Sequence, residues 1–328
     1  MLRTDHKFRR TAICWGVAFL WAGTPLRAQS SALVAPVRAF DIQKVWPGGG
    51  APAGKIRQIR AAGRSLYFQV SPTFSTLDSS IVRTNRDGRV ERAITLPPKS
   101  FIQEFAVDPA GTVYVLLMAS GTGGQRQVVV YGPDGEVAQA VPVSHQVLAL
   151  CAAGDTVLTV AATPTGLALA GVGSESSPLA SVTLSRSTSR LSALSLPDGR
   201  VAAVEPTAGV VHLIDLQRAS EVPVRPRVPE MQWLATLPPG NRTMNAVFGD
   251  AAVAPSGQIC LLLGHYRLSE GAAVVSFHMN GNLFQTIRYK LPDFPNGSGL
   301  MAPSSMAIYE GTTMVLAGGD GKVAEYPL

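Results

Sequence analysis

Short apolar runs alternate with small polar turns along most of the chain, and the same unit occurs six times. In each unit an apolar run ends at a turn that contains glycine, and a second apolar run follows directly. The segments are RAAGRSLYF, VDPAGTVYV, AAGDTVLTV, LPDGRVAAV, APSGQICLL and YEGTTMVLA. Their turn glycines, which recur every 43 to 58 residues, are Gly63, Gly111, Gly154, Gly199, Gly257 and Gly311. This period is typical of four-stranded propeller blades, so the pattern predicts an all-β, six-bladed β-propeller.

The runs within each unit predict four strands. They are short, rich in Val, Leu, Ala, Ile and Tyr, and separated by clusters of Gly, Pro, Asp, Asn and Ser. The first five blades are expected at residues 56–98, 101–143, 146–186, 189–229 and 243–292.

The sixth unit supplies only three strands, SSMAIYE, TTMVLAGG and KVAEYPL. Residues 34–45, VAPVRAFDIQKV, precede the first blade and have the composition of a strand. Because a propeller must close its ring to avoid an open sheet edge, we expect this segment to be the fourth strand of the sixth blade.

Turn residues assign the two faces of the disc. Glycines mark the connections between first and second strands, and Asp87-Gly88, Asp134-Gly135 and Asn280-Gly281 mark three connections between third and fourth strands. Strands alternate in direction, so both sets of tight turns lie on one face. The acids of these turns are expected to cap backbone amides; they are Asp87, Asp108, Asp134 and Asp198. Longer loops then lie on the opposite, irregular face, where binding residues are expected.

Blade two resembles an NHL-type repeat. In FAVDPAGTVYVLL a strand leads through Asp-x-x-Gly to a Val-Tyr-Val strand, and VVVYGPDGEV supplies a third strand that ends in Asp-Gly. The match is close in blade two, fair in blades four to six and poor in blade three. Such repeats occur in extracellular bacterial proteins of unknown role, in binding modules and in a few lyases and lactonases. The resemblance therefore implies the propeller fold and no single activity.

Residues 1–28 have the pattern of a cleaved signal peptide. A basic stretch precedes an apolar run over residues 11–23 and a small-residue cleavage site that ends at Ala28. The apolar run is shorter than the roughly 20 residues that a membrane-spanning helix needs, so no stable membrane insertion is expected. The mature propeller, residues 29–328, is expected in the periplasm or outside the cell. Arg9-Arg10 leaves a twin-arginine export route open.

Removal of this leader changes the charge of the chain. It takes away five of the 28 basic residues and one of the 22 acids, which leaves 23 against 21, a net charge of +2 instead of +6. A nucleic-acid partner is therefore not expected. The two cysteines that remain, Cys151 and Cys260, lie in apolar runs and are expected to be buried free thiols.

Candidate ligand-binding residues lie at the predicted irregular face. Arginine combined with tyrosine and amide side chains suits anionic ligands, glycans or acidic peptides, although such residues on loops are often simply solvated. The candidates are Arg57, Gln103, Glu104, His145, Arg190, Asn245, His265, Tyr266 and Arg267.

Catalytic and metal motifs are weak by comparison. The four histidines beyond the leader show no HxxxH or HExxH spacing, and no G-x-S-x-G is present. The tryptophans do not recur with the blades, which disfavours a quinone-cofactor dehydrogenase. Lactonases and esterases that resemble this architecture hold calcium through inner-strand acids and amides, for which Glu104, Asn245 and Asp250 are the candidates here.

The sequence thus favours an exported, non-enzymatic binding module without a cofactor, with a protein, peptide or glycan as its ligand. The alternative is a calcium-dependent propeller lactonase or lyase. A cation between inner-strand acids would favour the enzyme, whereas apolar or basic side chains there would favour the binding module.

Overall fold

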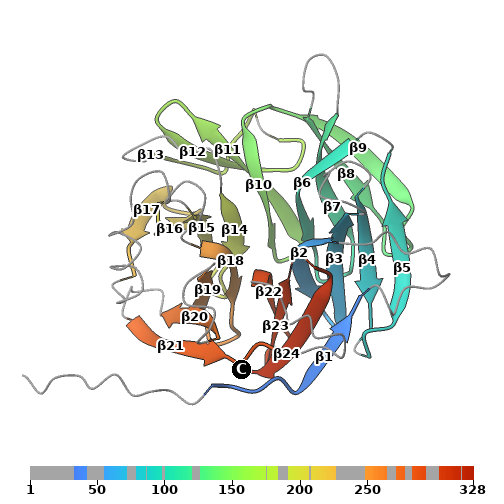
Figure 1. Cartoon of the computed structure of the whole chain (residues 1–328). Helices are drawn as coiled ribbons and strands as arrows, with labels where there is room; N and C mark the ends of the chain where they lie inside the picture. The colour runs from blue at the N-terminus through green and yellow to red at the C-terminus, as the bar shows by residue number, and fades with distance from the viewer. Residues whose placement is uncertain are drawn as a thin grey trace, which may run out of the picture. The chain divides into compact units, whose positions relative to one another are not determined.

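Six four-stranded antiparallel sheets make up the fold, and each is one blade of a propeller (Figure 1). The computed structural model describes residues 33–42, 55–71, 79–85, 87–97, 100–119, 126–174, 176–183, 191–206, 208–226, 248–263, 271–277, 283–292, 303–318 and 320–328. All six sheets belong to one unit, Ala32–Leu328. Within the described ranges, no helix is long and apolar enough to cross a membrane.

The strands follow one another in sequence order within the first five blades. Blade one contains β2 (Lys55–Ala62), β3 (Ser65–Ser71), β4 (Ser80–Thr84) and β5 (Val90–Thr95). Blade two contains β6 (Ser100–Val107), β7 (Val113–Ala119), β8 (Arg126–Tyr131) and β9 (Val137–Val143). Blade three contains β10 (Val147–Ala153), β11 (Thr156–Thr163), β12 (Gly166–Gly171) and β13 (Ala180–Thr183). Blade four contains β14 (Ser192–Ser195), β15 (Val201–Glu205), β16 (Val210–Asp215) and β17 (Ser220–Val224). Blade five contains β18 (Phe248–Val253), β19 (Ile259–Leu263), β20 (Ala272–Phe277) and β21 (Leu283–Tyr289).

The sixth blade takes its strands from both ends of the described chain. It contains β22 (Pro303–Tyr309), β23 (Thr313–Gly318), β24 (Lys322–Pro327) and β1 (Arg38–Asp41). β1 pairs antiparallel with β24, with Arg38 opposite Glu325 and Asp41 opposite Lys322. The predicted ring closure by an N-terminal strand is therefore confirmed. Residues 43–45 of the predicted closing segment lie outside the described residues.

The first strand of each blade is its inner strand, and these strands form a closed ring. Each of β2, β6, β10, β14 and β18 contacts the next, and β22 contacts both β18 and β2. The core consists of six apolar clusters, each of which combines side chains of two neighbouring blades. Tyr67 and Phe105, for example, meet between blades one and two. Both faces of every blade are thus buried against neighbours, which explains the nearly continuous apolar runs of the inner strands.

The predicted turn glycines are confirmed in all six blades, whereas the predicted Asn280-Gly281 turn lies outside the described residues. All six turn glycines have positive φ, between 56° and 88°, the region that favours glycine. At Gly311 a Cβ atom would lie 2.6 Å from Pro255 Cγ of the neighbouring blade, so glycine is needed there for space as well. Asp108, Asp134 and Asp198 cap backbone amides as expected. In blade one Asn85, rather than Asp87, accepts these hydrogen bonds.

Loop lengths on the irregular face differ between blades. The long connections between second and third strands belong to blades one, two and five, and their central residues lie outside the described ranges. In blades three, four and six the same connection spans only the short gaps 164–165, 206–209 and 319–321. Long connections between second and third strands are therefore restricted to three of the six blades.

Candidate functional site

Five of the inner strands contain a β-bulge close to their first residue. The pairing register shifts by one residue in β2, β6, β10, β18 and β22. The extra residues are Arg57, Gln103, Leu148, Gly249 and Ser304, which we call the bulge ring. All five are partly or fully exposed. Inner strands begin at the irregular face, so the bulge ring lies at this end of the propeller, and bulges of this kind redirect side chains next to binding sites.

The residue that follows each bulge points into the protein, and it is polar in four blades. These residues are Gln58, Glu104, Asp250 and Ser305. Glu104 is 3% exposed, Asp250 is 8% exposed and Ser305 is fully buried. Equivalent positions in the repeat thus bring polar side chains from different blades together. With Arg60, the last three form what we call the inner-strand cluster.

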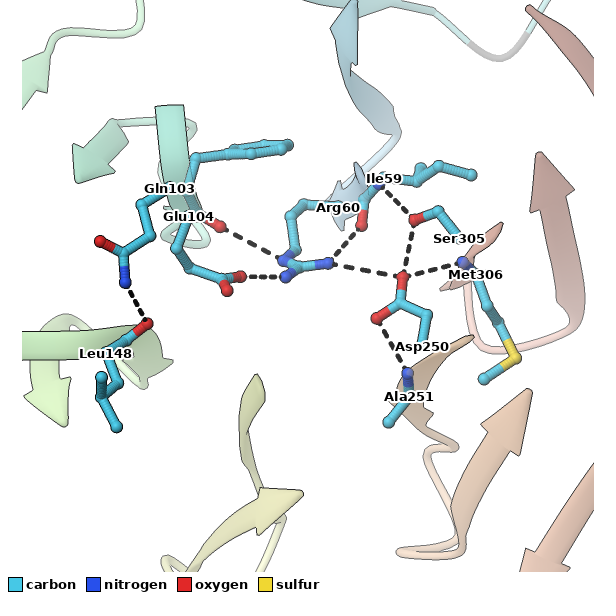
Figure 2. Close-up of polar contacts among 10 residues, drawn as sticks. Ile59, Arg60, Gln103, Glu104, Leu148, Asp250, Ala251, Ser305 and Met306 are labelled. Atoms are coloured by element: carbon cyan, nitrogen blue, oxygen red, sulfur yellow. Dashed lines mark hydrogen bonds and ion pairs between the residues drawn. The ribbon is translucent and has the colours of Figure 1, made fainter. Parts of the chain in front are cut away.

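Arg60 on β2 is the centre of this cluster (Figure 2). Its Nη2 donates to Glu104 Oε1 on β6, and its Nη1 lies 3.9 Å from Asp250 Oδ2 on β18. Nε donates to the carbonyl oxygen of Phe105 at 3.2 Å, and Nη1 donates to that of Ile59 at 2.8 Å. One guanidinium therefore links blades one, two and five.

Asp250 is held by donors on two blades. Ser305 Oγ and the Met306 amide donate to its Oδ2 at 2.6 and 2.9 Å, and the Ala251 amide donates to Oδ1 at 2.9 Å. Ser305 Oγ also accepts a hydrogen bond from the Ile59 amide at 2.8 Å. Asp250 thus accepts hydrogen bonds from three donors, and the serine hydroxyl is fully engaged between neighbouring strands.

Burial controls the electrostatics of the cluster. It raises the pKa of Glu104 to about 7; the Arg60 charge opposes this increase, and the Asp250 charge adds to it. Burial alone would lower the pKa of Arg60, but Glu104 and Asp250 raise it above its usual value. Burial also raises the pKa of Cys151 to about 12, so this thiol is neutral and is a poor nucleophile.

A hydrogen bond also joins two members of the bulge ring, and a second one lies next to it. Gln103 Nε2 donates to the carbonyl oxygen of Leu148 at 3.1 Å, so equivalent bulge residues of blades two and three are in direct contact (Figure 2). Arg126 on β8 donates to the carbonyl oxygen of Val147, directly before Leu148. Carbonyl groups at the irregular ends of the strands are thus fixed by side chains of the preceding blade.

The ligand-binding residues predicted from the sequence lie in different parts of the structure. Arg57 and Gln103 belong to the bulge ring, whereas Glu104 is buried and paired with Arg60. His145 is exposed in the turn between β9 and β10. The remaining candidates lie outside the described residues; they are Arg190, Asn245, His265, Tyr266 and Arg267.

Arg60 and Ser305 were not predicted from the sequence. No motif marks these two residues. Their partners, however, can be recognised by the number of residues between the acid and the turn glycine of its blade. Glu104 precedes Gly111 by the same seven positions by which Asp250 precedes Gly257. This shared offset indicates that the two acids occupy equivalent positions of the ring.

The acids proposed from the sequence as calcium ligands face an arginine side chain in the structure. A guanidinium lies between Glu104 and Asp250, and Asn245 is outside the described ranges. Within those ranges, no three His, Cys, Asp or Glu side chains form a group that could hold a metal ion. We therefore assign neither acid to a metal.

A second buried charged group lies in blade four, on strands other than the inner one. His212 Nδ1 on β16 lies 2.7 Å from Glu221 Oε1 on β17, and Nε2 lies 3.5 Å from Glu205 Oε2 on β15. His212 and Glu205 are only 6% and 5% exposed. Both ring nitrogens face carboxylates of the same sheet, as expected for a packing histidine.

Comparison with known proteins agrees with the fold. No protein-family model and no curated protein matches the chain, so the NHL-type resemblance is not confirmed. The chain is similar to a protein of unknown function from Bacteroides thetaiotaomicron, with a TM-score of 0.57 and 13% identity over 90% of this chain and 75% of that chain. It is also similar to a catalytically inactive virginiamycin B lyase from Staphylococcus aureus with quinupristin (TM-score 0.53, 9% identity, 89% and 98% covered). A third similar structure is that of the RRP9 WD40 repeats (TM-score 0.53, 12% identity, 91% and 99% covered). At such identities the similarity shows the fold alone.

Proposed function

We propose that this propeller is an exported, non-enzymatic binding module that holds a protein, peptide or glycan ligand at the bulge ring and the loops around it. The observation that carries the proposal is the bulge itself, which recurs in five inner strands and carries a different side chain in each. A rigid backbone that presents variable side chains at one end is suited to recognition. Arg57 and Gln103 provide a cation and an amide for anionic or hydroxyl-rich groups.

The inner-strand cluster favours binding over hydrolysis. Glu104 and Asp250 face a guanidinium, so a calcium ion would have to displace Arg60 to reach both acids. Ser305 is fully buried, and its Oγ is held between Asp250 and a backbone amide, so a substrate cannot reach this hydroxyl. The cluster is therefore better suited to fixing the blades than to attacking a substrate.

Export is part of the proposal, and the leader pattern of residues 1–28 supports it. The mature protein would then act in the periplasm or outside the cell, without stable membrane insertion. Because its net charge is only +2, a nucleic-acid partner is not part of the proposal.

The test is a binding screen of the mature protein, residues 29–328, against acidic and neutral peptides and glycans. We expect specific binding that Arg57→Gln and Gln103→Ala each weaken at least tenfold. Arg89→Gln, an exposed arginine at a tight turn, is the matched control and should leave binding unchanged. Hydrolysis that survives purification and is abolished in Glu104→Gln would instead establish the enzyme alternative.

A further inference from the structure

The inner-strand cluster has an unbalanced charge when all its groups are ionised. Arg60 on β2 and Asp250 on β18 are the charged groups that face Glu104, and Cys151 on β10 faces it as a neutral thiol. Two carboxylates and one guanidinium give a net charge of −1. The side chains of Glu104 and Asp250 are only 4% and 8% exposed, and an unbalanced charge at such depth is strongly unfavourable.

The hydrogen bonds indicate which of the two acids can bind a proton and so remove the extra negative charge. Asp250 accepts from three donors, so a proton on it would displace a hydrogen bond. Glu104 accepts from Arg60 through Oε1, and its side-chain hydrogen bond with Gln58, like that with Arg60, lowers its pKa. Glu104 thus has fewer donors than Asp250, and a proton on Glu104 leaves the hydrogen bonds of Asp250 and Ser305 in place.

Gln58 provides an independent observation. Its Oε1 is buried, yet among the described residues no donor reaches it. A buried acceptor without a donor is rare and requires an explanation. The Gln58 amide already hydrogen-bonds Glu104 and lowers the pKa of that carboxyl, which is the effect of donation by its NH2 group. A hydroxyl proton on Glu104 would supply the missing donor to Oε1 of the same amide.

We propose that the inner-strand cluster is a proton-binding site, in which Glu104 carries one exchangeable proton that it donates to Gln58, and that loss of this proton leaves a net negative charge directly behind the bulge ring. The raised pKa of Glu104, about 7, places the exchange near neutrality. The proton-binding site does not depend on the proposed function. If an acidic ligand does bind at the bulge ring, its affinity will fall as the proton is released.

Infrared difference spectroscopy of the mature protein tests the proposal directly. We expect the carbonyl stretch of a protonated, buried carboxyl near pH 5, which disappears as the pH is raised through neutrality. The band should be absent in Glu104→Gln and unchanged in Glu136→Gln, an exposed glutamate of blade two. The proposal is wrong if the wild-type spectrum contains no such band, or if the band remains in Glu104→Gln.

A second variant separates proton binding from packing. Asp250→Asn removes the neighbouring negative charge, so the midpoint of the Glu104 titration should fall by at least one pH unit, a tenfold loss of proton affinity. A midpoint that stays at the wild-type value in Asp250→Asn would contradict the charge argument, even if the protein binds ligands as proposed.

Discussion

Arg60 donates a hydrogen bond to Glu104 across the junction of blades one and two, and the same guanidinium faces Asp250 of blade five. The pair is nearly inaccessible, with side-chain exposures of 18% and 4%. Ion pairs at the surface contribute little to stability, whereas removal of one partner from a buried pair leaves a costly charge. The pair therefore controls both the stability of the ring and its response to pH.

Replacement of Arg60 by methionine should destabilise the propeller by about 3–5 kcal/mol near neutral pH. The variant keeps most of the apolar side chain but leaves two buried carboxylates without their cation. Urea unfolding measures the effect, and Arg89→Met, at an exposed arginine, is the control. The double variant Arg60→Met/Glu104→Gln should recover part of the loss. An Arg60→Met protein as stable as the control would show that the cluster does not stabilise the ring.

The pH dependence of stability should contain a contribution from Glu104. Its pKa is raised from 4.5 to about 7 in the folded protein, so the folded state binds more protons than the unfolded state between these values. The contribution is therefore present below about pH 4.5 and is lost as the pH rises through about 7, with a total of about 3 kcal/mol at most. Unfolding free energies at several pH values should fall more steeply in the wild type than in Glu104→Gln. Parallel curves would contradict the assignment.

The closing strand should be essential for the ring. The Val34 amide donates to the carbonyl oxygen of Arg288 at 2.9 Å, and Ile42 is buried to 1% exposure, so this segment contacts blades five and six. Ile42→Ala removes buried methyl groups between blades and should cost about 2–4 kcal/mol. Val37→Ala is the matched control, because Val37 is 69% exposed and should change stability by less than about 0.5 kcal/mol. Equal effects of the two substitutions would indicate that the segment does not close the ring in solution.

Calcium should leave the thermal stability of the mature protein unchanged. An ion that binds only the folded state raises the melting temperature, but Arg60 already lies between the two acids that calcium would need. Differential scanning calorimetry with calcium and with a chelator tests this expectation, with the Arg60→Met variant alongside. A chelator-reversible increase in the wild type would favour the calcium-dependent lactonase or lyase.

The sequence by itself determined the repeat, the number of blades and the ring closure. These features depend on local chemistry, since glycine is needed wherever a tight turn has positive φ and apolar runs are needed wherever both faces of a strand are buried. The same reasoning identified Glu104 and Asp250 as inner-strand acids and Arg57 and Gln103 as residues at the irregular end. The assignment of these four residues requires only the position of each within its own blade.

Only the tertiary structure decided which residues of different blades meet. Arg60 and Ser305 carry no motif, and their roles depend on partners that are 44 and 55 residues away in the chain. The bulges that insert the partly exposed Arg57 and Gln103 into their strands are register shifts between paired strands. Such relationships arise from the closure of the ring, because closure brings distant strands into contact and no local sequence pattern encodes that contact.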